Sequence, residues 1–198
     1  MLVTEYMSNG DLQNFLSHAS SSSFSWKQKL RCALDVSEGL VYLHSWDPKI
    51  IHRDLKPANV LLNGELRAKI ADFGISREMD ESTMTVGMGT YRWMAPEVLT
   101  SGHYSESADI FSLGAILSEL DTHKTPYSDL VNTNGKSLTD AAILSKVMNG
   151  GIRPTFTAAC PRVVLDLAAD CLSFDPEERP LAVEVSFRLR TALKEFMN

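Results

Sequence analysis

The segment 108–117 constrains the fold most, because its apolar residues cover every face of a helix. The members of this run are Ala108, Ile110, Phe111, Leu113, Ala115, Ile116 and Leu117. A surface helix carries one apolar stripe, whereas a helix that is apolar all round must be enclosed by other elements. The apolar window 110–120 is bounded by Asp109 and Glu119 and is too short to span a membrane. We therefore expect a buried helix at the centre of a mainly helical domain.

The composition sets the class of protein. A chain of 198 residues with 44% hydrophobic and 22% charged residues is long enough for one domain with a substantial core. The net charge of -6 argues against nucleic acid or an anionic membrane as a partner recognised by bulk charge. Cys32, Cys160 and Cys171 are widely spaced, which predicts reduced thiols in an intracellular protein. The first residues do not resemble a signal peptide, so we expect a cytoplasmic protein.

Short apolar runs predict a small amount of β structure. Leu2–Glu5 is expected to be a strand that Asn9-Gly10 breaks. The runs 60–62 and 68–70 flank the sequence Asn63-Gly64-Glu65-Leu66, which predicts a β-hairpin with its turn at Asn-Gly.

Helical periodicity accounts for most of the remaining chain. Asp11 is expected to cap a short helix through Leu16, and an amphipathic helix with Leu30 and Leu34 on its apolar face ends near His44. One later helix is expected to start at Pro161. Another carries apolar residues at intervals of four, namely Leu181, Val185, Leu189 and Leu193. The predicted fold class is mainly α with a small β-hairpin (α+β).

Three polar residues surround the predicted hairpin. Asp54 lies five residues before Asn59, just ahead of the first strand, and Asp72 follows the second strand. A hairpin would bring these side chains together, and carboxylate and amide oxygens suit Mg²⁺ with substrate phosphates as further ligands. Lys56 would face a phosphate as a mobile cation. Taken singly, these residues are also typical of turns and helix caps.

The order of three motifs decides between these interpretations. They are His52-Arg53-Asp54 with Asn59, then Asp72-Phe73-Gly74, then Ala95-Pro96-Glu97. Together they resemble the signature set of protein kinases, and the resemblance covers the chain from the interlobe hinge to the last helix. The segment 89–97 most resembles the tyrosine-kinase-like group of Ser/Thr kinases, which includes Raf-like and mixed-lineage enzymes. The implied parts are a hinge over residues 1–10, a catalytic loop over 51–59, an activation segment over 72–97 and C-lobe helices to residue 198.

The resemblance implies specific chemical roles. Asp54 corresponds to the catalytic Asp that orients the substrate hydroxyl and accepts its proton, and Lys56 to the lysine that neutralises the transferring phosphoryl group. Thr90 would hydrogen-bond both of them. Asn59 and Asp72 correspond to the residues that hold Mg²⁺ on the phosphates of ATP. Lys56 and Thr90 together indicate a Ser/Thr kinase whose substrates are proteins.

The opening segment resembles the hinge that binds adenine. Thr4 would be the gatekeeper, the backbones of Glu5 and Met7 would bond the adenine edge, and Asp11 would reach the ribose. Leu61 would form the floor beneath the adenine. The alternative for these positions is an ordinary edge strand followed by a helix cap.

Further residues match the family in regulation or in structure. Arg53 precedes the catalytic Asp and would pair with a phosphate on the activation segment, added by an upstream or partner kinase. The hydroxyls in the matching region are Ser82, Thr83 and Thr85. The residues with implied structural roles are His52, Phe73, Gly74, Glu97, Asp109 and Arg179. Among them, Glu97 and Arg179 would form a buried ion pair, and Asp109 would hold the catalytic-loop backbone.

The glycine-rich loop, the strand lysine and the partner glutamate of the family are not found in this sequence. We expect the chain to be the catalytic-lobe part of a kinase whose N-lobe is missing apart from the hinge strand, with little activity of its own. The alternative is a catalytically dead module that docks partner kinases or substrates. The intact set of Asp54, Lys56, Asn59 and Asp72 favours the enzyme. A Mg²⁺-dependent hydrolase would have no use for the segment 90–97.

Overall fold

The computed structural model describes residues 3–19, 23–72 and 90–196. Phe73, Gly74, Ser82, Thr83 and Thr85 lie outside these residues. The helices and strands are α1 (Leu12–His18), α2 (Trp26–His44), β1 (Val60–Leu62), β2 (Ala68–Ile70), α3 (Pro96–Ser101), α4 (Glu106–Thr122), α5 (Asp140–Met148), α6 (Arg162–Cys171) and α7 (Ala182–Glu195). Single 3-10 turns cover Pro57–Asn59, Thr90–Trp93 and Pro176–Glu178. The predicted fold class, mainly helical with one antiparallel hairpin, is confirmed.

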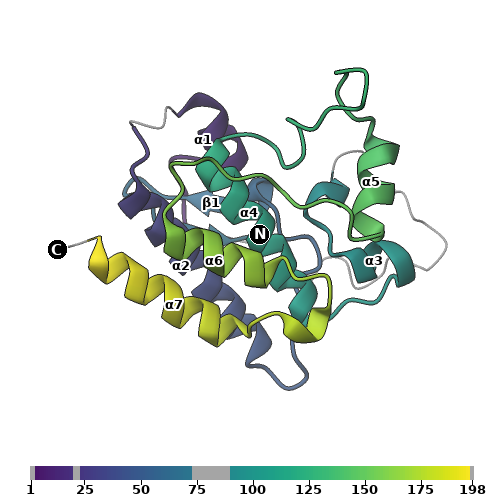
Figure 1. Cartoon of the computed structure of the whole chain (residues 1–198). Helices are drawn as coiled ribbons and strands as arrows, with labels where there is room; N and C mark the ends of the chain where they lie inside the picture. The colour runs from purple at the N-terminus through teal and green to yellow at the C-terminus, as the bar shows by residue number, and fades with distance from the viewer. Residues whose placement is uncertain (1–2, 20–22, 73–89, 197–198) are drawn as a thin grey trace.

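Helix α4 lies at the centre of the molecule (Figure 1). Every residue from 108 to 121 is buried, as the apolar run predicted. The helix packs against α2 on one side and α6 on the other. Gly114 permits the approach to α6, because a Cβ at this position would lie 2.8 Å from the Leu172 Cγ. The site described below is therefore anchored on the most enclosed element of the described chain.

The hairpin joins β1 to β2 in antiparallel register, with Leu61 opposite Lys69. Asn63 organises the turn: its side-chain oxygen accepts hydrogen bonds from the backbone N–H groups of Glu65 and Arg67. In this turn the residue with a positive φ is Leu66, at 59°. The sequence had indicated a turn at Asn63-Gly64, but Gly64 does not have a positive φ. Strand β2 packs on α2, where Asp35 accepts two hydrogen bonds from the Arg67 guanidinium.

The strand predicted at Leu2–Glu5 is wrong for the part that the structure describes. Residues 3–7 have no regular secondary structure, because no neighbouring strand in the described chain offers them a hydrogen-bonded ladder. The chain pairs with β1 only further on, through Asn9 N to Leu62 O and Leu62 N to Gly10 O. Asp11 caps α1 as predicted, since its carboxylate accepts from the Asn14 N–H at 2.8 Å.

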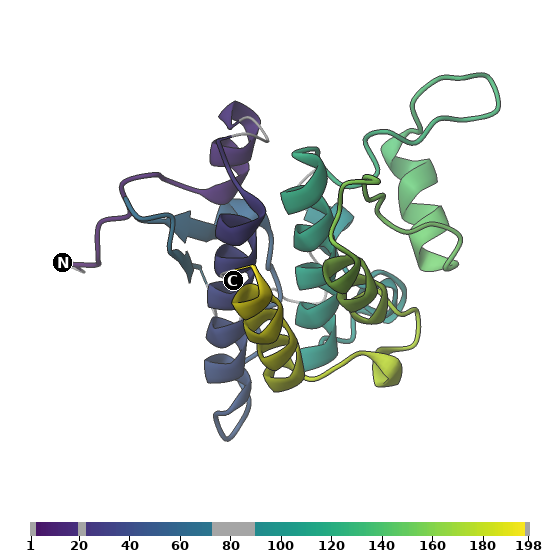
Figure 2. The ribbon, with the colours of Figure 1, turned by 60° about the vertical axis from the view of Figure 1, so that its left-hand side comes forward.

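The last two helices agree with the predicted pattern except at their first residues. α6 begins at Arg162, one residue after Pro161. In α7, Val185, Leu189 and Leu193 are buried against α2, which runs beside it (Figure 2). Leu181 is 61% exposed, because it precedes the first helical residue and so stands outside the buried stripe. Its expected place in the apolar repeat of this helix was therefore wrong.

Two short helices, α3 and α5, were not predicted from periodicity. They pack against each other at the side of the molecule, where α5 stands apart from the central bundle (Figure 2). Tyr91 and Tyr127 fill the space beneath α5 with Ile143 and Val147. No helix among the described residues is long and apolar enough to cross a membrane. The three cysteines are free thiols.

Candidate active site

The expected catalytic loop, residues 51–59, is hydrogen-bonded to α4 through one buried carboxylate. Asp109 Oδ2 accepts from the His52 N–H at 2.8 Å, and Oδ1 accepts from the Arg53 N–H at 3.0 Å. His44, at the end of α2, places its Nε2 2.9 Å from Asp109 Oδ2. A carboxylate only accepts hydrogen bonds, so this nitrogen of His44 is the donor. Asp109 thereby ties α2, α4 and the loop into one unit at the residue before Asp54.

His52 is fully buried, and both of its ring nitrogens contact backbone groups. Nε2 lies 3.0 Å from the Ala71 carbonyl, so it carries the proton and donates. Nδ1 accepts from the Asp54 N–H at 3.3 Å. This geometry connects the catalytic loop to the end of β2, and it leaves neither nitrogen available as a proton acceptor for a substrate.

Asp54, Lys56 and Asn59 form the polar centre of the site. Lys56 Nζ donates to both oxygens of Asp54, at 3.0 and 2.8 Å. Asn59 Nδ2 donates to the Asp54 carbonyl at 2.8 Å and to its Oδ2 at 3.0 Å. The Asp54 side chain is 33% exposed, so solvent and ligands reach it. The result is an accessible carboxylate whose position is fixed from two sides.

The segment 90–93 lies against this centre. Lys56 Nζ donates to Thr90 Oγ1 at 3.2 Å, so one ammonium group contacts both Asp54 and Thr90. Of the two hydrogen bonds expected for Thr90, the described structure contains the one to Lys56 and not the one to Asp54. The segment is anchored from below by α4, where Trp93 Nε1 donates to Glu119 Oε2 at 3.1 Å and the Ser112 hydroxyl donates to the Trp93 carbonyl at 2.7 Å. Arg92 of this segment donates to the Pro126 carbonyl and to the Asp140 carboxylate at the start of α5, both at 2.7 Å.

Asp72 stands two residues beyond β2, with an exposed side chain and a φ of 59°. Its neighbour Ala71 donates its N–H to the Asn59 carbonyl at 2.8 Å, so the backbone just before Asp72 lies beside Asn59. The Asn59 amide nitrogen points to Asp54, which leaves its Oδ1 for a cation. An amide oxygen and one carboxylate are hard donors of the kind that Mg²⁺ accepts together with substrate phosphates. The residues present therefore fit the cation.

The residues predicted to bind the nucleotide share fewer contacts than those around Asp54. Thr4 and Glu5 are exposed, and the Glu5 carboxylate pairs with Lys69 on β2. The Met7 carbonyl accepts from the Gly10 N–H in a turn, at 3.1 Å. Asp11 and Leu61 face each other in an isolated bridge, and one oxygen of Asp11 is engaged as the α1 cap. Capping, the alternative interpretation of Asp11, is thus present in the structure.

Glu97 and Arg179 form a bidentate ion pair below the site. Arg179 Nη1 and Nη2 lie 2.7 and 2.8 Å from the two oxygens of Glu97. The Arg179 side chain is buried and lies over the Phe111 ring of α4, 5.1 Å from its centroid. This pair joins α3, which follows the segment 90–93, to the turn before α7.

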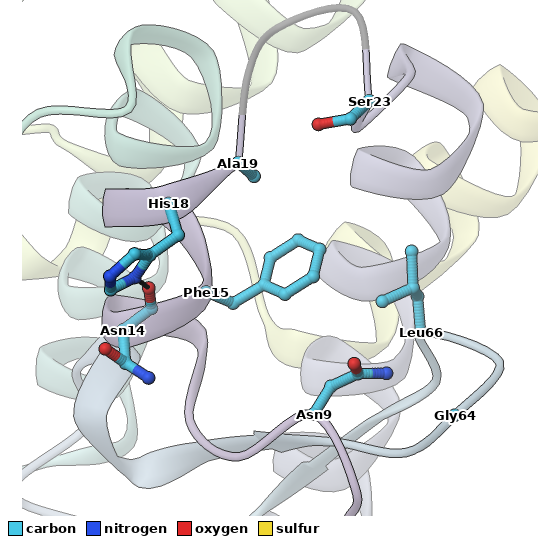
Figure 3. A pocket seen from close by; sticks show the side chains of 8 residues that line it. All are labelled: Asn9, Asn14, Phe15, His18, Ala19, Ser23, Gly64 and Leu66. Atoms are coloured by element: carbon cyan, nitrogen blue, oxygen red, sulfur yellow. Dashed lines mark hydrogen bonds between the residues drawn. The ribbon is translucent and has the colours of Figure 1, made fainter.

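A separate hollow of about 530 Å³ lies between α1, the start of α2 and the hairpin turn. Phe15 points into it from α1, Leu66 from the hairpin, and Asn9 from the segment that precedes α1 (Figure 3). Its other lining residues are Asn14, His18, Ala19, Ser23 and Gly64. None of these residues belongs to the set around Asp54, so this hollow is not where the phosphate chemistry would occur.

Sequence reasoning missed several residues that shape the site. His44 and Glu119 had no motif to mark them, because each acts through a contact with a residue far away in the chain. Arg92 was seen only as part of a motif, although it anchors the segment to α5. A polar residue inside an apolar helix could have marked such positions. The clearest example is Glu119, which lies within the apolar helix that begins near residue 108.

A loop held by a buried carboxylate, an accessible Asp54, a bridging lysine and a following hairpin agree with the resemblance to protein kinase domains. Comparison with known sequences agrees: the family model of the protein kinase domain matches residues 1–187. The chain belongs to the protein kinase domain family.

Its relatives are kinases from several organisms. Over 98% of the chain it is 38% identical to the probable serine/threonine-protein kinase roco7 of Dictyostelium discoideum, of which it covers 8%. It is 39% identical to the serine/threonine/tyrosine-protein kinase HT1 of Arabidopsis thaliana, over 90% of the chain and 44% of that protein. With serine/threonine-protein kinase STY17 of the same plant it shares 39% identity, over 98% of the chain and 32% of the relative. The chain spans less than half the length of each of these relatives.

Proposed function

We propose that the domain containing this chain transfers the γ-phosphate of ATP to serine or threonine hydroxyls of protein substrates. The observation that carries the proposal is the position of the Lys56 ammonium, which contacts the Asp54 carboxylate and the Thr90 hydroxyl at once. This arrangement places a base, a cation and a fixed hydroxyl around one point. Phosphoryl transfer needs little more than such positioning and charge neutralisation.

In the proposed reaction, Asp54 orients the substrate hydroxyl and accepts its proton as the oxygen–phosphorus bond forms. The bond between the γ-phosphorus and the bridging oxygen breaks, and ADP leaves. Lys56 offsets the negative charge on the transferring group, and Thr90 limits the orientations open to Lys56. Asn59 fixes the Asp54 carboxylate through its amide nitrogen, so the base does not rotate away.

Asn59 and Asp72 would hold Mg²⁺, which supplies charge neutralisation on the phosphates of ATP when bound. For the adenine, the proposal rests on the family resemblance of Thr4, Glu5, Met7, Asp11 and Leu61. The pairing of residues 9–11 with β1 supports it, because it holds the hinge segment beside Leu61. We place the reaction in the cytoplasm, where ATP and reduced thiols are both available.

The choice of acceptor amino acid follows from Lys56 and Thr90, which resemble Ser/Thr kinases of the tyrosine-kinase-like group. Tyrosine is the alternative acceptor, because the relative HT1 is named a serine/threonine/tyrosine-protein kinase. Phosphoamino-acid analysis of a protein substrate labelled by the enzyme separates the two. Phosphoserine and phosphothreonine are the expected products, and phosphotyrosine as the main product would contradict the assignment.

Regulation is part of the proposal. Arg53 is exposed beside Asp54, and its guanidinium would receive a phosphate carried by Ser82, Thr83 or Thr85, which lie outside the described residues. Replacing these three residues by alanine, one at a time, should show which of them an upstream kinase uses. The expected readout is loss of activation at one position.

The central experiment is Asp54→Asn in the longest product of the gene, assayed with ATP, Mg²⁺ and a generic Ser/Thr protein substrate. We expect the transfer rate to fall about 10²–10⁴-fold, the usual contribution of a positioned general base. Asp166→Asn is the matched control, because Asp166 is an exposed carboxylate on α6. Equal rates in the Asp54 variant and the control would refute the role of Asp54. Absence of transfer in the unsubstituted protein, with binding to partner proteins retained, would favour the docking module instead.

A further inference from the structure

Arg53 has an unusual backbone and an unusual neighbour. Its φ of 70° lies in the left-handed region that residues other than glycine rarely adopt. The hydrogen bond from its N–H to Asp109 holds it there. Its guanidinium carbon lies 5.8 Å from the centroid of the Tyr104 ring, in the connection between α3 and α4. The Arg53 side chain is therefore directed to the ring of a residue 51 positions away in the chain.

No carboxylate is paired with Arg53 within the described ranges 3–19, 23–72 and 90–196. Two carboxylates nonetheless lie near the same ring, because Asp54 and Asp109 both act on Tyr104, and Asp109 lines one cavity with Arg53 and Tyr104. Burial raises the pKa of Tyr104, and the charges of Asp54 and Asp109 raise it further, so both carboxylates act on this ring. A guanidinium close to a carboxylate normally pairs with it through two parallel hydrogen bonds. Here the Asp54 oxygens are bonded to Lys56 and Asn59 instead. The Asp109 oxygens are bonded to backbone N–H groups and to His44.

The Arg53 guanidinium lies beside the ring of Tyr104. A cation over an aromatic face is attracted by the ring. A cavity of only about 10 Å³ remains between Arg53, Tyr104 and Asp109, and its other lining residues are Met94, Ala95, Val98, Ala108 and Ser112. That volume holds about one water molecule. A smaller side chain at 104 would open space through which the guanidinium reaches Asp109.

We infer that Tyr104 is a positioning residue for the phosphoryl-transfer site, whose ring holds the Arg53 guanidinium apart from Asp54 and Asp109. Two consequences follow. Asp54 keeps Lys56 and Asn59 as its partners and stays accessible to the substrate hydroxyl. The N–H edges of Arg53 stay open to a phosphate oxyanion, because contact with a ring occupies the face of the cation. The effect on catalysis rests on the proposed function, whereas the effect on Arg53 does not.

Kinetics test the catalytic part. The variants are Tyr104→Phe, which keeps the ring, and Tyr104→Leu, which removes it, each in the longest gene product. Tyr42→Leu is the matched control, because Tyr42 is an exposed tyrosine whose ring meets Trp46 at the end of α2. We expect kcat of Tyr104→Leu to fall roughly tenfold with an unchanged KM for ATP, since a misplaced catalytic group lowers kcat. Tyr104→Phe and the control should keep the original kcat. Equal kcat values in the Phe and Leu variants would overturn the inference.

Nuclear magnetic resonance tests the geometry without any need for activity. In the chain labelled with ¹⁵N-arginine, the Nε–H signal of Arg53, assigned through Arg53→Lys, should be shifted upfield by the ring. The shift should persist in Tyr104→Phe and disappear in Tyr104→Leu. Tyr104→Met serves in place of Leu if circular dichroism shows that the Leu variant unfolds. An Arg53 signal that is identical with and without the ring would overturn the inference. A ring-dependent shift in a protein without transferase activity would instead count against the proposed function alone.

Discussion

The indole N–H of Trp93 donates a hydrogen bond to the Glu119 carboxylate at 3.1 Å, inside the protein. Both residues are buried, with 5% and 3% of their surfaces exposed. Glu119 belongs to the central helix α4 and Trp93 to the segment that carries Thr90. The contact therefore holds the segment 90–93 on the central helix, and Thr90 of this segment contacts Lys56.

Burial raises the pKa of Glu119 from its ordinary 4.5 to about 7, although the bond from Trp93 acts in the opposite direction. The folded protein thus binds a proton between pH 4.5 and 7 that the unfolded chain does not bind. The contribution of Glu119 to the free energy of unfolding therefore falls by about 3 kcal/mol as pH rises from 4.5 to 7. Above pH 7 this contribution is constant. In urea titrations from pH 5 to 8, Glu119→Gln should lose this dependence because glutamine stays neutral, and it should be relatively more stable at pH 8. The exposed Glu65→Gln is the control, and a difference between wild type and Glu119→Gln that does not vary with pH would contradict the prediction.

His123 should produce a pH dependence of the opposite sign. Its Nδ1 donates to the Ala19 carbonyl at 3.0 Å, and Nε2 is buried with no hydrogen-bond partner in the described part of the chain. Burial lowers the pKa of His123, and the charge of Lys29 lowers it further, while the bond to Ala19 and the charge of Asp121 oppose them. The unfolded chain therefore binds the proton first as pH falls, so stability is lost below about pH 6.5.

The variant that checks this is His123→Asn, since asparagine tolerates the φ of 55° at this helix end. Between pH 7 and 5, thermal unfolding of wild type should lose stability more steeply than that of the variant. His103→Asn, at an exposed histidine, should follow wild type. Parallel curves for wild type and His123→Asn would show that the ring is not held neutral.

The hairpin, and the contact between Asp54 and Asn59 just before it, were predictable because their information is local. Asp54 and Asn59 are five residues apart, and β1 follows at once, so a short range of sequence determines how they meet. The buried helix was equally clear, since an apolar surface on all sides permits no exposed position. These features depend on spacing and hydrophobicity, which the sequence displays directly.

The remainder of the site depends on contacts between distant segments. His44 meets Asp109 across 65 positions, and neither periodicity nor a motif predicts that α2 ends beside α4. The expected strand at Leu2–Glu5 failed for the same reason, because a strand exists only where a partner supplies hydrogen bonds. Leu181 fits the four-residue interval but lies before α7 begins, and an interval alone does not mark where a helix starts.

The Glu97–Arg179 pair should contribute far more to stability than a surface pair. Arg179 is buried, so removing Glu97 leaves a cation without its counter-ion in the interior. We expect Glu97→Ala to lower the free energy of unfolding by about 3–5 kcal/mol. The exposed pair of Arg188 and Asp170 is the comparison, and Asp170→Ala should cost no more than about 1 kcal/mol. Similar losses for the two variants in urea unfolding would contradict this ranking.

Thr90 offers the sharpest test of the contact on which the proposed reaction rests. Its hydroxyl accepts a hydrogen bond from the charged Lys56 ammonium at 3.2 Å, and bonds to charged groups contribute about 1.5–3 kcal/mol. Thr90→Val removes the oxygen and keeps the shape, so kcat should fall about ten- to hundredfold, if the bond acts fully in the transition state. Thr90→Ser keeps the oxygen and should restore most of the rate.

The control for shape is Thr100→Val on α3, where the threonine hydroxyl donates to the Pro96 carbonyl outside the site. Steady-state rates for the three variants separate the role of the oxygen from that of the methyl group. If Thr90→Ser were as slow as Thr90→Val, the methyl group and its packing would matter instead of the bond to Lys56. The Thr90 hydroxyl is expected to act only through the Lys56 ammonium. The double variant Thr90→Val, Lys56→Met should therefore be no slower than Lys56→Met alone.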